Sequence, residues 1–366
     1  MSPRVLICCN AVVRREYVTG EGVARLERLA DWEWLPSEGV STRPGVWGGP
    51  SEDPADAERL RAKLSQEPGF DALVVCHGAP FVDAAMLDGA PRLRLLGELE
   101  GDRFANRLDV EAAAARGVRV VDTTHGSSLP VAEWALGLML IGVRNAAEHY
   151  RRLIGGEEYR RSTDDPGYRL GELSGRRVGL IGLGHVGRRL VELLQPFGCH
   201  ITAHDPYVAK EVALAMHVEL TTLQGLLATS DVVVCTAPLT PRTRRMLGAA
   251  ELDLLKADAV FVNVSRGAIV DPEALIARAR RGDIRVCVDV FDPEPIPKAS
   301  PIRELPNVFL SPHIAGVTAA CRPRFFSCMV DELERFFSGR ETLFDITPAT
   351  LANRRGLDPT TVVYPS

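Results

Sequence analysis

The first 120 residues or so alternate short apolar runs with segments in which apolar residues recur every three or four positions. Such runs predict buried strands, and the recurring pattern predicts helices with one apolar face. The predicted strands are 4–9, 71–76, 93–97 and 118–122, and the predicted helices are 22–30, 55–64, 82–87 and 110–116. Strands that alternate with helices at this spacing favour a parallel sheet with helices on both faces.

A long apolar helix is predicted from about Pro130, with Ser127 or Ser128 as its N-cap. It is followed by a charged surface segment, the 155–172 excursion, and a second alternating series starts at Arg177. Its predicted strands are 178–181, 201–204, 232–236, 259–264, 286–290 and 308–310, and its predicted helices are 188–197, 223–228 and 272–280. Two such series predict two α/β domains, as the length of 366 residues also suggests. The tail after Asp345 lacks periodicity, so we expect it to wrap the surface or to be mobile.

Composition narrows the class of protein without naming a function. A net charge of −5 and the absence of a basic stripe give no reason to expect nucleic acid or an anionic membrane as a partner. The longest apolar stretch, 131–143, is too short to span a membrane and contains Glu133, so it predicts a buried helix. Eight scattered cysteines without a CxxC pair or clustered histidines predict free thiols, no metal site and a reducing cytoplasm.

The strongest local motif is the glycine loop that follows the predicted strand 178–181. Gly182, Gly184 and Gly187 have the GxGxxG spacing, which permits a tight turn, close approach of the backbone to a pyrophosphate, and close packing of helix on strand. The amino end of the following helix offers N–H groups to phosphates. This motif predicts dinucleotide binding.

An acidic residue indicates which dinucleotide the loop would bind. Asp205 ends the next predicted strand, 18 residues after Gly187, where a carboxylate can accept hydrogen bonds from the adenosine ribose. It would repel a 2′-phosphate, and the following Pro206 and Tyr207 offer no arginine in compensation. We therefore expect NAD (NADH) as the cofactor rather than NADP.

Three later strands are each followed by a residue suited to carbonyl chemistry. Arg266, Glu294 and His313 lie in three loops at the carboxyl ends of predicted strands, where open parallel sheets bind ligands. Each residue alone is more typical of a surface or structural role. Together they supply a cation for a carboxylate and a histidine held by an acid, which reduction of a carbonyl by hydride transfer requires.

With these motifs in place, the chain resembles the D-isomer-specific 2-hydroxyacid dehydrogenase family. The resemblance covers about residues 70–320 and rests on segments in the family's order. They are Val131-Ala-Glu-Trp134, Gly182-Leu-Gly-His-Val-Gly187, Ala237-Pro-Leu-Thr-Pro241, Asn263-Val-Ser-Arg-Gly-Ala-Ile-Val-Asp271, Asp289-Val-Phe-Asp-Pro-Glu-Pro295 and Ser311-Pro-His-Ile-Ala-Gly316.

The resemblance implies roles for individual residues. Arg266 would bind the substrate carboxylate, His313 would be the general acid/base, and Glu294 would hydrogen-bond His313. The implied cofactor contacts are Gly182, Gly184, His185, Val186 and Gly187 at the pyrophosphate, Asp205 at the ribose, Thr236, Pro238, Val264 and Ser265 along the nicotinamide half, Asp289 near the carboxamide, and Gly316. His77 and Gly78 would join Arg266 in binding substrate.

The resemblance also implies the fold and the assembly. A Rossmann-type NAD-binding domain, 122–317, would be inserted into a flavodoxin-like α/β substrate domain formed by 1–121 and 318–366, with hinge closure of the cleft. A homodimer through the NAD domain is implied as well.

Two loops depart from the family's pattern. Cys76-His-Gly-Ala79 stands where an Arg-Ser-x-Thr-like loop is usual, and the charged Gly97-Glu-Leu-Glu-Gly-Asp-Arg-Phe-Ala-Asn-Arg107 replaces a loop of small residues. The predicted function is NAD-dependent interconversion of a small 2-oxo acid and its D-2-hydroxy acid. Two alternatives stay open: a phosphite or phosphonate dehydrogenase of the same family, and an NAD(H)-sensing binding protein without catalysis.

Overall fold

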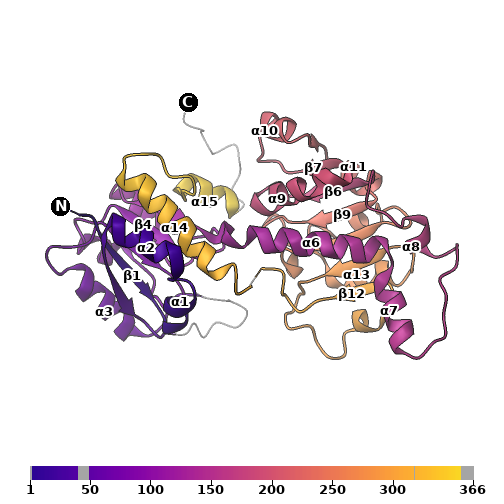
Figure 1. Cartoon of the computed structure of the whole chain (residues 1–366), viewed down its shortest axis with the longest axis horizontal. Coiled ribbons are helices and arrows are strands. Elements are labelled where there is room, and N and C mark those ends of the chain that lie inside the picture. Colours follow the sequence, from indigo (N-terminus) through magenta and orange to yellow (C-terminus); the bar gives the residue numbers. More distant parts are fainter. Residues whose placement is uncertain (1, 40–48, 317, 356–366) are drawn as a thin grey trace. The chain divides into compact units, whose positions relative to one another are not determined.

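The computed structural model describes residues 2–39, 49–316 and 318–355. The chain divides into two compact units (Figure 1). Unit 1 combines Met1–Ser127 with Val317–Ser366, and unit 2 is Ser128–Gly316. The chain therefore passes between units at 127/128 and 316/317, whereas the sequence analysis places the domain boundaries at 121/122 and 317/318.

Unit 1 is built on a five-stranded parallel sheet of order β2-β1-β3-β4-β5, the flavodoxin-like order. Its strands are β1 (Arg4–Cys9), β2 (Asp31–Pro36), β3 (Ala72–Val75), β4 (Leu95–Glu98) and β5 (Arg119–Asp122). Alternate residues of β1 enter two different cores, Leu6 and Cys8 on one face and Val5 and Ile7 on the other. Because both faces are covered, the strand is apolar without alternation, as in other parallel sheets.

Helices on both faces complete unit 1. They are α1 (Ala11–Glu16), α2 (Gly20–Leu29), α3 (Pro54–Leu64), α4 (Ala84–Asp88), α5 (Val110–Ala115), α14 (Arg322–Phe337) and α15 (Pro348–Arg354). Asn10, Asp53, Asp83 and Asp109 each accept a backbone N–H at a helix N-terminus, which fixes where these helices begin. The tail after Asp345, which the sequence predicts to wrap the surface or to be mobile, forms a short helix at 348–354 that Thr347 caps. The end of that tail, 356–366, lies outside the described residues.

Unit 2 contains a seven-stranded parallel sheet of order β12-β11-β10-β9-β6-β7-β8. The strands are β6 (Arg177–Ile181), β7 (His200–His204), β8 (Glu219–Leu220), β9 (Val232–Cys235), β10 (Val260–Asn263), β11 (Arg285–Val288) and β12 (Val308–Leu310). The strand order reverses at β6, beside β9, which is the Rossmann arrangement. A ligand is therefore expected at the carboxyl ends of β6 and β9, where the crevice of such a sheet opens.

The helices of unit 2 are α6 (Ser128–Val143), α7 (Ala146–Ile154), α8 (Pro166–Arg169), α9 (His185–Leu194), α10 (Lys210–Ala215), α11 (Leu223–Thr229), α12 (Ala249–Leu252) and α13 (Pro272–Ala279). The described residues contain one helical stretch, Thr124–Val143, that is long and apolar enough to cross a membrane. Half of its apolar window is buried in the structure, and α6 packs against α9, β10 and β11. These contacts are those of a core helix.

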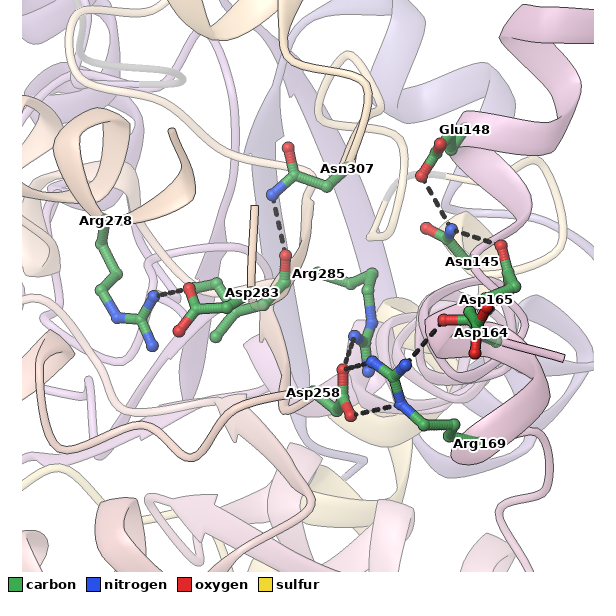
Figure 2. A network of polar contacts seen from close by, with 12 residues as sticks. Asn145, Glu148, Asp164, Asp165, Arg169, Asp258, Arg278, Asp283, Arg285 and Asn307 are labelled. Atoms are coloured by element: carbon green, nitrogen blue, oxygen red, sulfur yellow. Dashed lines mark hydrogen bonds and ion pairs between the residues drawn. The ribbon is translucent and has the colours of Figure 1, made fainter. Parts of the chain in front are cut away.

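A polar network secures the amino edge of this sheet, opposite the expected crevice (Figure 2). Arg169 donates two hydrogen bonds to Asp258, which precedes β10, and Arg285 at the start of β11 donates to the same carboxylate. Asp165 accepts from Gly167 and from Asn145. The network thus ties the end of the 155–172 excursion to the sheet, and we assign it a structural role.

Candidate active site

The glycine loop lies at the carboxyl end of β6 and leads directly into α9. Gly182 has φ +97°, and a Cβ there would lie 2.8 Å from the amide nitrogen of Ala237. A Cβ on Gly187 would lie 2.5 Å from the carbonyl oxygen of Gly182, whereas Gly184 has open space around it. Two of the glycines are therefore required by packing, and the third leaves the backbone open to a ligand.

The helix after this loop starts earlier than the sequence predicts. α9 begins at His185 rather than at residue 188, and its N-cap Gly184 makes no side-chain capping bond. The propensity pattern missed this turn because glycine and histidine are weak helix formers. The early start places the amide groups of His185, Val186 and Gly187 at the positive end of the helix, where a pyrophosphate would be stabilised.

Two side chains fix the glycine loop to the neighbouring strands. Asp205, just past β7, accepts a hydrogen bond from the Leu183 amide at 2.8 Å and from the Tyr207 amide at 2.9 Å. Thr236, just past β9, donates its hydroxyl to the Gly182 carbonyl at 2.8 Å. Each Asp205 oxygen keeps a second lone pair for a ribose hydroxyl. The open backbone at Gly184 and this carboxylate fit the pyrophosphate and ribose of NAD.

The loop after β10 carries Arg266 next to a glycine that nothing larger could replace. A Cβ on Gly267 would lie 2.0 Å from the carbonyl carbon and oxygen of Phe291. The loop after β10 therefore packs backbone to backbone on the loop after β11, which contains Glu294. Ser265 donates its hydroxyl to the Ala237 carbonyl, and Asn263 accepts from the Ser265 amide at 3.1 Å. Val264 lies in the loop after β10, and Pro238 lies in the loop after β9.

His313 and Glu294 contact each other in the candidate site. His313 Nδ1 and Glu294 Oε1 are 2.6 Å apart, and both side chains are about one third exposed, at 39% and 35%. Because the ionised carboxylate is an acceptor only, Nδ1 carries the proton of this bond, and Nε2 is the nitrogen left for a substrate. The arrangement is a histidine oriented by an acid.

Asp289 organises the loop that carries His313. Its buried carboxylate accepts from the Ser311 hydroxyl at 2.5 Å and from the amides of Ile314 and Ala315 at 3.1 and 2.9 Å. The His313 amide donates to the Asp289 carbonyl at 2.8 Å. His313 itself has φ +53°, a conformation that costs a non-glycine residue about 1–3 kcal/mol and persists only where surrounding contacts enforce it. Asp289 supplies those contacts.

Further contacts from α6 support this loop. Trp134 donates its indole N–H to the Ser311 hydroxyl at 3.1 Å. Gly316 is the last residue of unit 2. A Cβ placed on it would lie 3.5 Å from the side chain of Val131. The segment Val131–Trp134, which the sequence analysis uses only as a family marker, thus steadies the His313 loop.

The remaining predicted site residues, His77 and Gly78, belong to unit 1. They follow β3, and Gly78 has φ +90° with its would-be Cβ 2.0 Å from the Ser37 carbonyl oxygen. Both ring nitrogens of His77 are already engaged: Nδ1 is 3.0 Å from Arg107 Nη2, and Nε2 is 2.9 Å from Glu100 Oε2. The ring therefore has no polar atom to spare for a substrate.

A cation site at this point of unit 1 is disfavoured. Cys76, His77 and Glu100 have ligand atoms within 4.8 Å of one another. However, the Arg107 guanidinium adjoins the imidazole, and burial raises the pKa of the Cys76 thiol well above its usual value. A metal would have to displace a cation and deprotonate a buried thiol.

The charged segment after β4 is largely internal. Glu98 and Asp122 are register partners on β4 and β5 and are fully buried. One oxygen of each flanks Gly101, at 2.3 and 2.8 Å from the position of a Cβ there. Burial raises the pKa of Glu98 to about 7, and burial raises that of Asp122 as well. The sequence suggested either a substrate loop or a solvated face, and the solvated face is wrong for Glu98 because it is buried between two strands.

The comparisons with known proteins agree with this geometry. Residues 136–315 match the family model described as "D-isomer specific 2-hydroxyacid dehydrogenase, NAD binding domain". The chain is 34% identical over 276 residues to the glyoxylate reductase of Aeropyrum pernix, covering 75% of this chain and 80% of that protein. The chain belongs to the D-isomer-specific 2-hydroxyacid dehydrogenase family. The relatives are named dehydrogenases and reductases, so this is a family of NAD-dependent oxidoreductases.

Two further relatives bear on the extent and the fold of this family member. The chain is 34% identical over 271 residues to the D-3-phosphoglycerate dehydrogenase of Methanocaldococcus jannaschii, a match of 74% of this chain that spans 50% of that longer protein. A phosphoglycerate oxidoreductase from Rhizobium etli superposes with a TM-score of 0.75 at 22% identity, over 94% of this chain and 97% of that one. The Rossmann and flavodoxin-like fold predicted from the sequence is confirmed.

Sequence reasoning missed several residues of the site. For Asp289 it predicted a place near the carboxamide, which stays a prediction, and it did not foresee that the carboxylate holds the His313 loop. It did not single out Arg107, Glu100 or Tyr17, which come together with His77 from separate elements. Arg107 lies in the charged segment 97–107, and its partners could not be named without the strand order.

Proposed function

We propose that this family member interconverts a small 2-oxo acid and its D-2-hydroxy acid with NAD(H). The observation that carries the proposal is the 2.6 Å contact between His313 and Glu294. The loop that carries Glu294 packs against the loop that carries Arg266. A histidine oriented by a carboxylate is a proton donor and acceptor suited to neutral pH. An arginine in the neighbouring loop system of the same sheet offers the planar fork that a carboxylate needs.

The residues of unit 2 divide the work as follows. Arg266 binds the substrate carboxylate and orients the carbonyl. His313 Nε2 gives a proton to the carbonyl oxygen during reduction and takes it back during oxidation, while Glu294 keeps Nδ1 protonated and the ring in place. Asp289 holds the backbone of the His313 loop. Asp205 and the amides of His185 and Val186 hold the ribose and the pyrophosphate.

The chemistry that NAD supplies when bound is hydride transfer. We further propose that unit 1 is the substrate domain and that its loop at His77 and Gly78 contacts the substrate through backbone groups. The support is its position at the carboxyl end of a strand in a parallel sheet. The names of the relatives, a glyoxylate reductase and a D-3-phosphoglycerate dehydrogenase, set the range of acids to be tested.

Steady-state kinetics of two variants test these roles. His313→Gln is expected to lower kcat at least about 100-fold while NADH affinity, measured by fluorescence titration, changes little. Arg266→Lys keeps the charge but loses the planar fork, so KM for the 2-oxo acid should rise. His200→Gln, an exposed histidine at the start of β7, is the control and should behave as wild type. A His313→Gln enzyme that keeps the wild-type rate would contradict the assignment.

The same assay separates the two alternative functions. An NAD(H) sensor would bind NADH tightly and turn over none of glyoxylate, pyruvate or hydroxypyruvate. A phosphite or phosphonate dehydrogenase would reduce NAD with those anions in preference to 2-hydroxy acids.

The predicted homodimer through unit 2 also stays a proposal, and one surface supports it. Tyr150, Leu153 and Ile154 on α7 are 64%, 60% and 67% exposed, and apolar side chains grouped on a surface are typical of protein interfaces. Ile154→Lys should shift the chain from dimer to monomer in sedimentation, whereas Glu158→Lys, on the exposed segment beyond, should not. A wild-type monomer would overturn the proposal. The predicted cytoplasmic location rests on eight free cysteines and stays a prediction.

A further inference from the structure

One contact within unit 2 joins two loops that lie on either side of the glycine loop. Tyr207 follows β7, Arg242 lies in the loop after β9, and Arg242 Nη1 donates to the Tyr207 hydroxyl at 3.2 Å. β6, whose carboxyl end carries the glycine loop, lies between β7 and β9 in the sheet. The contact therefore spans the edge of the sheet at which a dinucleotide is expected.

Two threonines fix the loop that carries Arg242. The Thr240 amide donates to Thr243 Oγ1 at 2.7 Å, and the Thr243 amide donates to Thr240 Oγ1 at 3.1 Å. Thr243 Oγ1 in turn donates to the Pro238 carbonyl at 2.7 Å. These hydrogen bonds close a compact turn around Arg242, so its backbone is held in place while its side chain reaches Tyr207 at the surface.

The positive charge of Arg242 is not used by a carboxylate of the protein. Arg245, three residues further along, pairs with Asp271 at 3.4 Å. Arg242 forms no ion pair with any carboxylate of the described residues, where the Tyr207 hydroxyl is the one hydrogen-bond partner of its side chain. A structural ion pair therefore does not explain this arginine.

The pair presents hydrogen-bond donors to solvent. A guanidinium only donates, so the Tyr207 oxygen is the acceptor of their contact and the phenolic proton stays available. Arg242 keeps its remaining N–H groups, and both residues are exposed. A phosphate has only acceptor oxygens and carries negative charge, so it is the group that such a set of donors fits.

The pair is tied to the residue proposed to hold the adenosine ribose. Asp205 Oδ1 accepts the Tyr207 amide at 2.9 Å. The 2′-oxygen of that ribose is the atom that carries the additional phosphate of NADPH. The sequence offers no arginine at Pro206 or Tyr207 to compensate for Asp205, but the fold brings Arg242 to Tyr207 from a different loop.

We infer that Arg242, together with Tyr207, binds the 2′-phosphate of NADPH and makes NADPH a second cofactor of this enzyme beside NADH. The inference rests on the proposed function and on the proposed role of Asp205. Asp205 still favours the unphosphorylated ribose, so NADH remains the preferred cofactor. Arg242 offsets the repulsion between the Asp205 carboxylate and the 2′-phosphate.

The test is calorimetric titration of the full-length protein with NADH and NADPH, and with AMP and adenosine 2′,5′-bisphosphate. The two members of each pair differ only by the 2′-phosphate. Wild type should bind NADPH, and added salt should weaken NADPH more than NADH because the arginine is exposed. The second readout is kcat/KM for glyoxylate with each cofactor.

Variants of the two residues assign the effect. Arg242→Gln should weaken NADPH about tenfold and NADH less than about twofold, whereas Arg242→Lys keeps the charge and should retain most of the NADPH affinity. Tyr207→Phe removes one donor and should weaken NADPH about threefold. Arg244→Gln removes the same charge from an exposed position of the same loop and is the matched control, with wild-type affinities expected.

The results that would overturn the inference differ from those that would overturn the proposed function. A wild-type protein that binds NADH but not NADPH refutes the inference and leaves the proposed function intact. An equal loss of NADH and NADPH affinity in Arg242→Gln shows that the arginine contacts the shared part of the cofactor, which also refutes it. Absence of turnover with both cofactors, with the binding difference retained, refutes the proposed function and supports the assignment of Arg242.

Discussion

At the scale of single residues, the catalytic proposal depends on how His313 is held. The residue has a positive φ, and its loop is fixed by three hydrogen bonds to the Asp289 carboxylate and one to the Asp289 carbonyl. The sequence predicted His313 and Glu294 because each follows a strand end. It could not predict what Asp289 contacts, because an acid after a strand can serve a ligand or a backbone equally well.

Asp289→Asn should therefore act through His313. In the wild type, backbone N–H groups of the loop donate to the two carboxylate oxygens of Asp289. In the variant, an NH₂ group replaces one of these oxygens and cannot accept a hydrogen bond. The loop therefore loses at least one contact, and His313 shifts. Misplacement by about 1 Å can cost a factor of about 100 in rate, and we expect kcat to fall about 10- to 100-fold. Steady-state kinetics check this, with Ser311→Ala as the milder variant that removes one of the four contacts. An unchanged kcat in Asp289→Asn would refute the positioning role.

At the scale of elements, strands that carry an apolar run were predicted, and strands without such a run were missed. The apolar runs that became β3, β9 and β10 lie wholly in the core. β2 was missed because Asp31-Trp-Glu-Trp alternates charged and aromatic residues on a partly buried edge strand, and the two-residue β8 is too short for periodicity. Which loops touch was also beyond the sequence, since it depends on the strand order.

The contact between the loops after β10 and β11 gives a prediction at this scale. Gly267→Ala would place a methyl group 2.0 Å from the Phe291 backbone, so the two loops must separate. Overpacking of this kind costs about 1–3 kcal/mol, and the displacement of Arg266 should also raise KM for the 2-oxo acid.

A matched glycine should respond in the opposite direction. Gly137 lies inside α6, and its would-be Cβ has no neighbour closer than 3.8 Å. Gly137→Ala should therefore stabilise the protein by about 0.5–1 kcal/mol through helix propensity. Chemical denaturation of both variants measures the two changes in the free energy of unfolding. Equal effects of the two substitutions would contradict the described packing of Gly267.

At the scale of the whole molecule, two parallel sheets with Rossmann and flavodoxin-like strand orders place all the predicted chemistry at carboxyl edges. The motifs of unit 2 were readable in the sequence because they are contiguous. The contacts of His77 with Glu100 and Arg107 and the buried Glu98–Asp122 pair were not, because they join residues far apart in sequence through the register of β3, β4 and β5.

The buried pair links stability of the molecule to pH. Burial raises the folded-state pKa of Glu98 from 4.5 to about 7. The corresponding stability is fully present below pH of about 4.5 and is lost as pH rises through about 7, because the unfolded chain ionises more readily. The loss should be on the order of 1–3 kcal/mol.

Urea denaturation of wild type and Glu98→Gln at several pH values isolates this contribution. Other carboxylates act in the opposite direction, as at Asp258, whose pKa is lowered by hydrogen bonds from Arg169, so the difference between the two proteins is the relevant quantity. Wild type should lose stability relative to Glu98→Gln between pH 4.5 and 7. A difference independent of pH would show that Glu98 is ionised throughout.

The central claim is that this family member performs NAD-dependent interconversion of 2-oxo and D-2-hydroxy acids, with His313, Glu294 and Arg266 at the reacting carbonyl. The most direct measurement incubates the purified chain with NADH and the panel of 2-oxo acids and follows NADH loss together with chiral chromatography of the product. The account predicts equimolar formation of NAD and a D-2-hydroxy acid. NADH binding without consumption, or formation of the L-isomer, would contradict it.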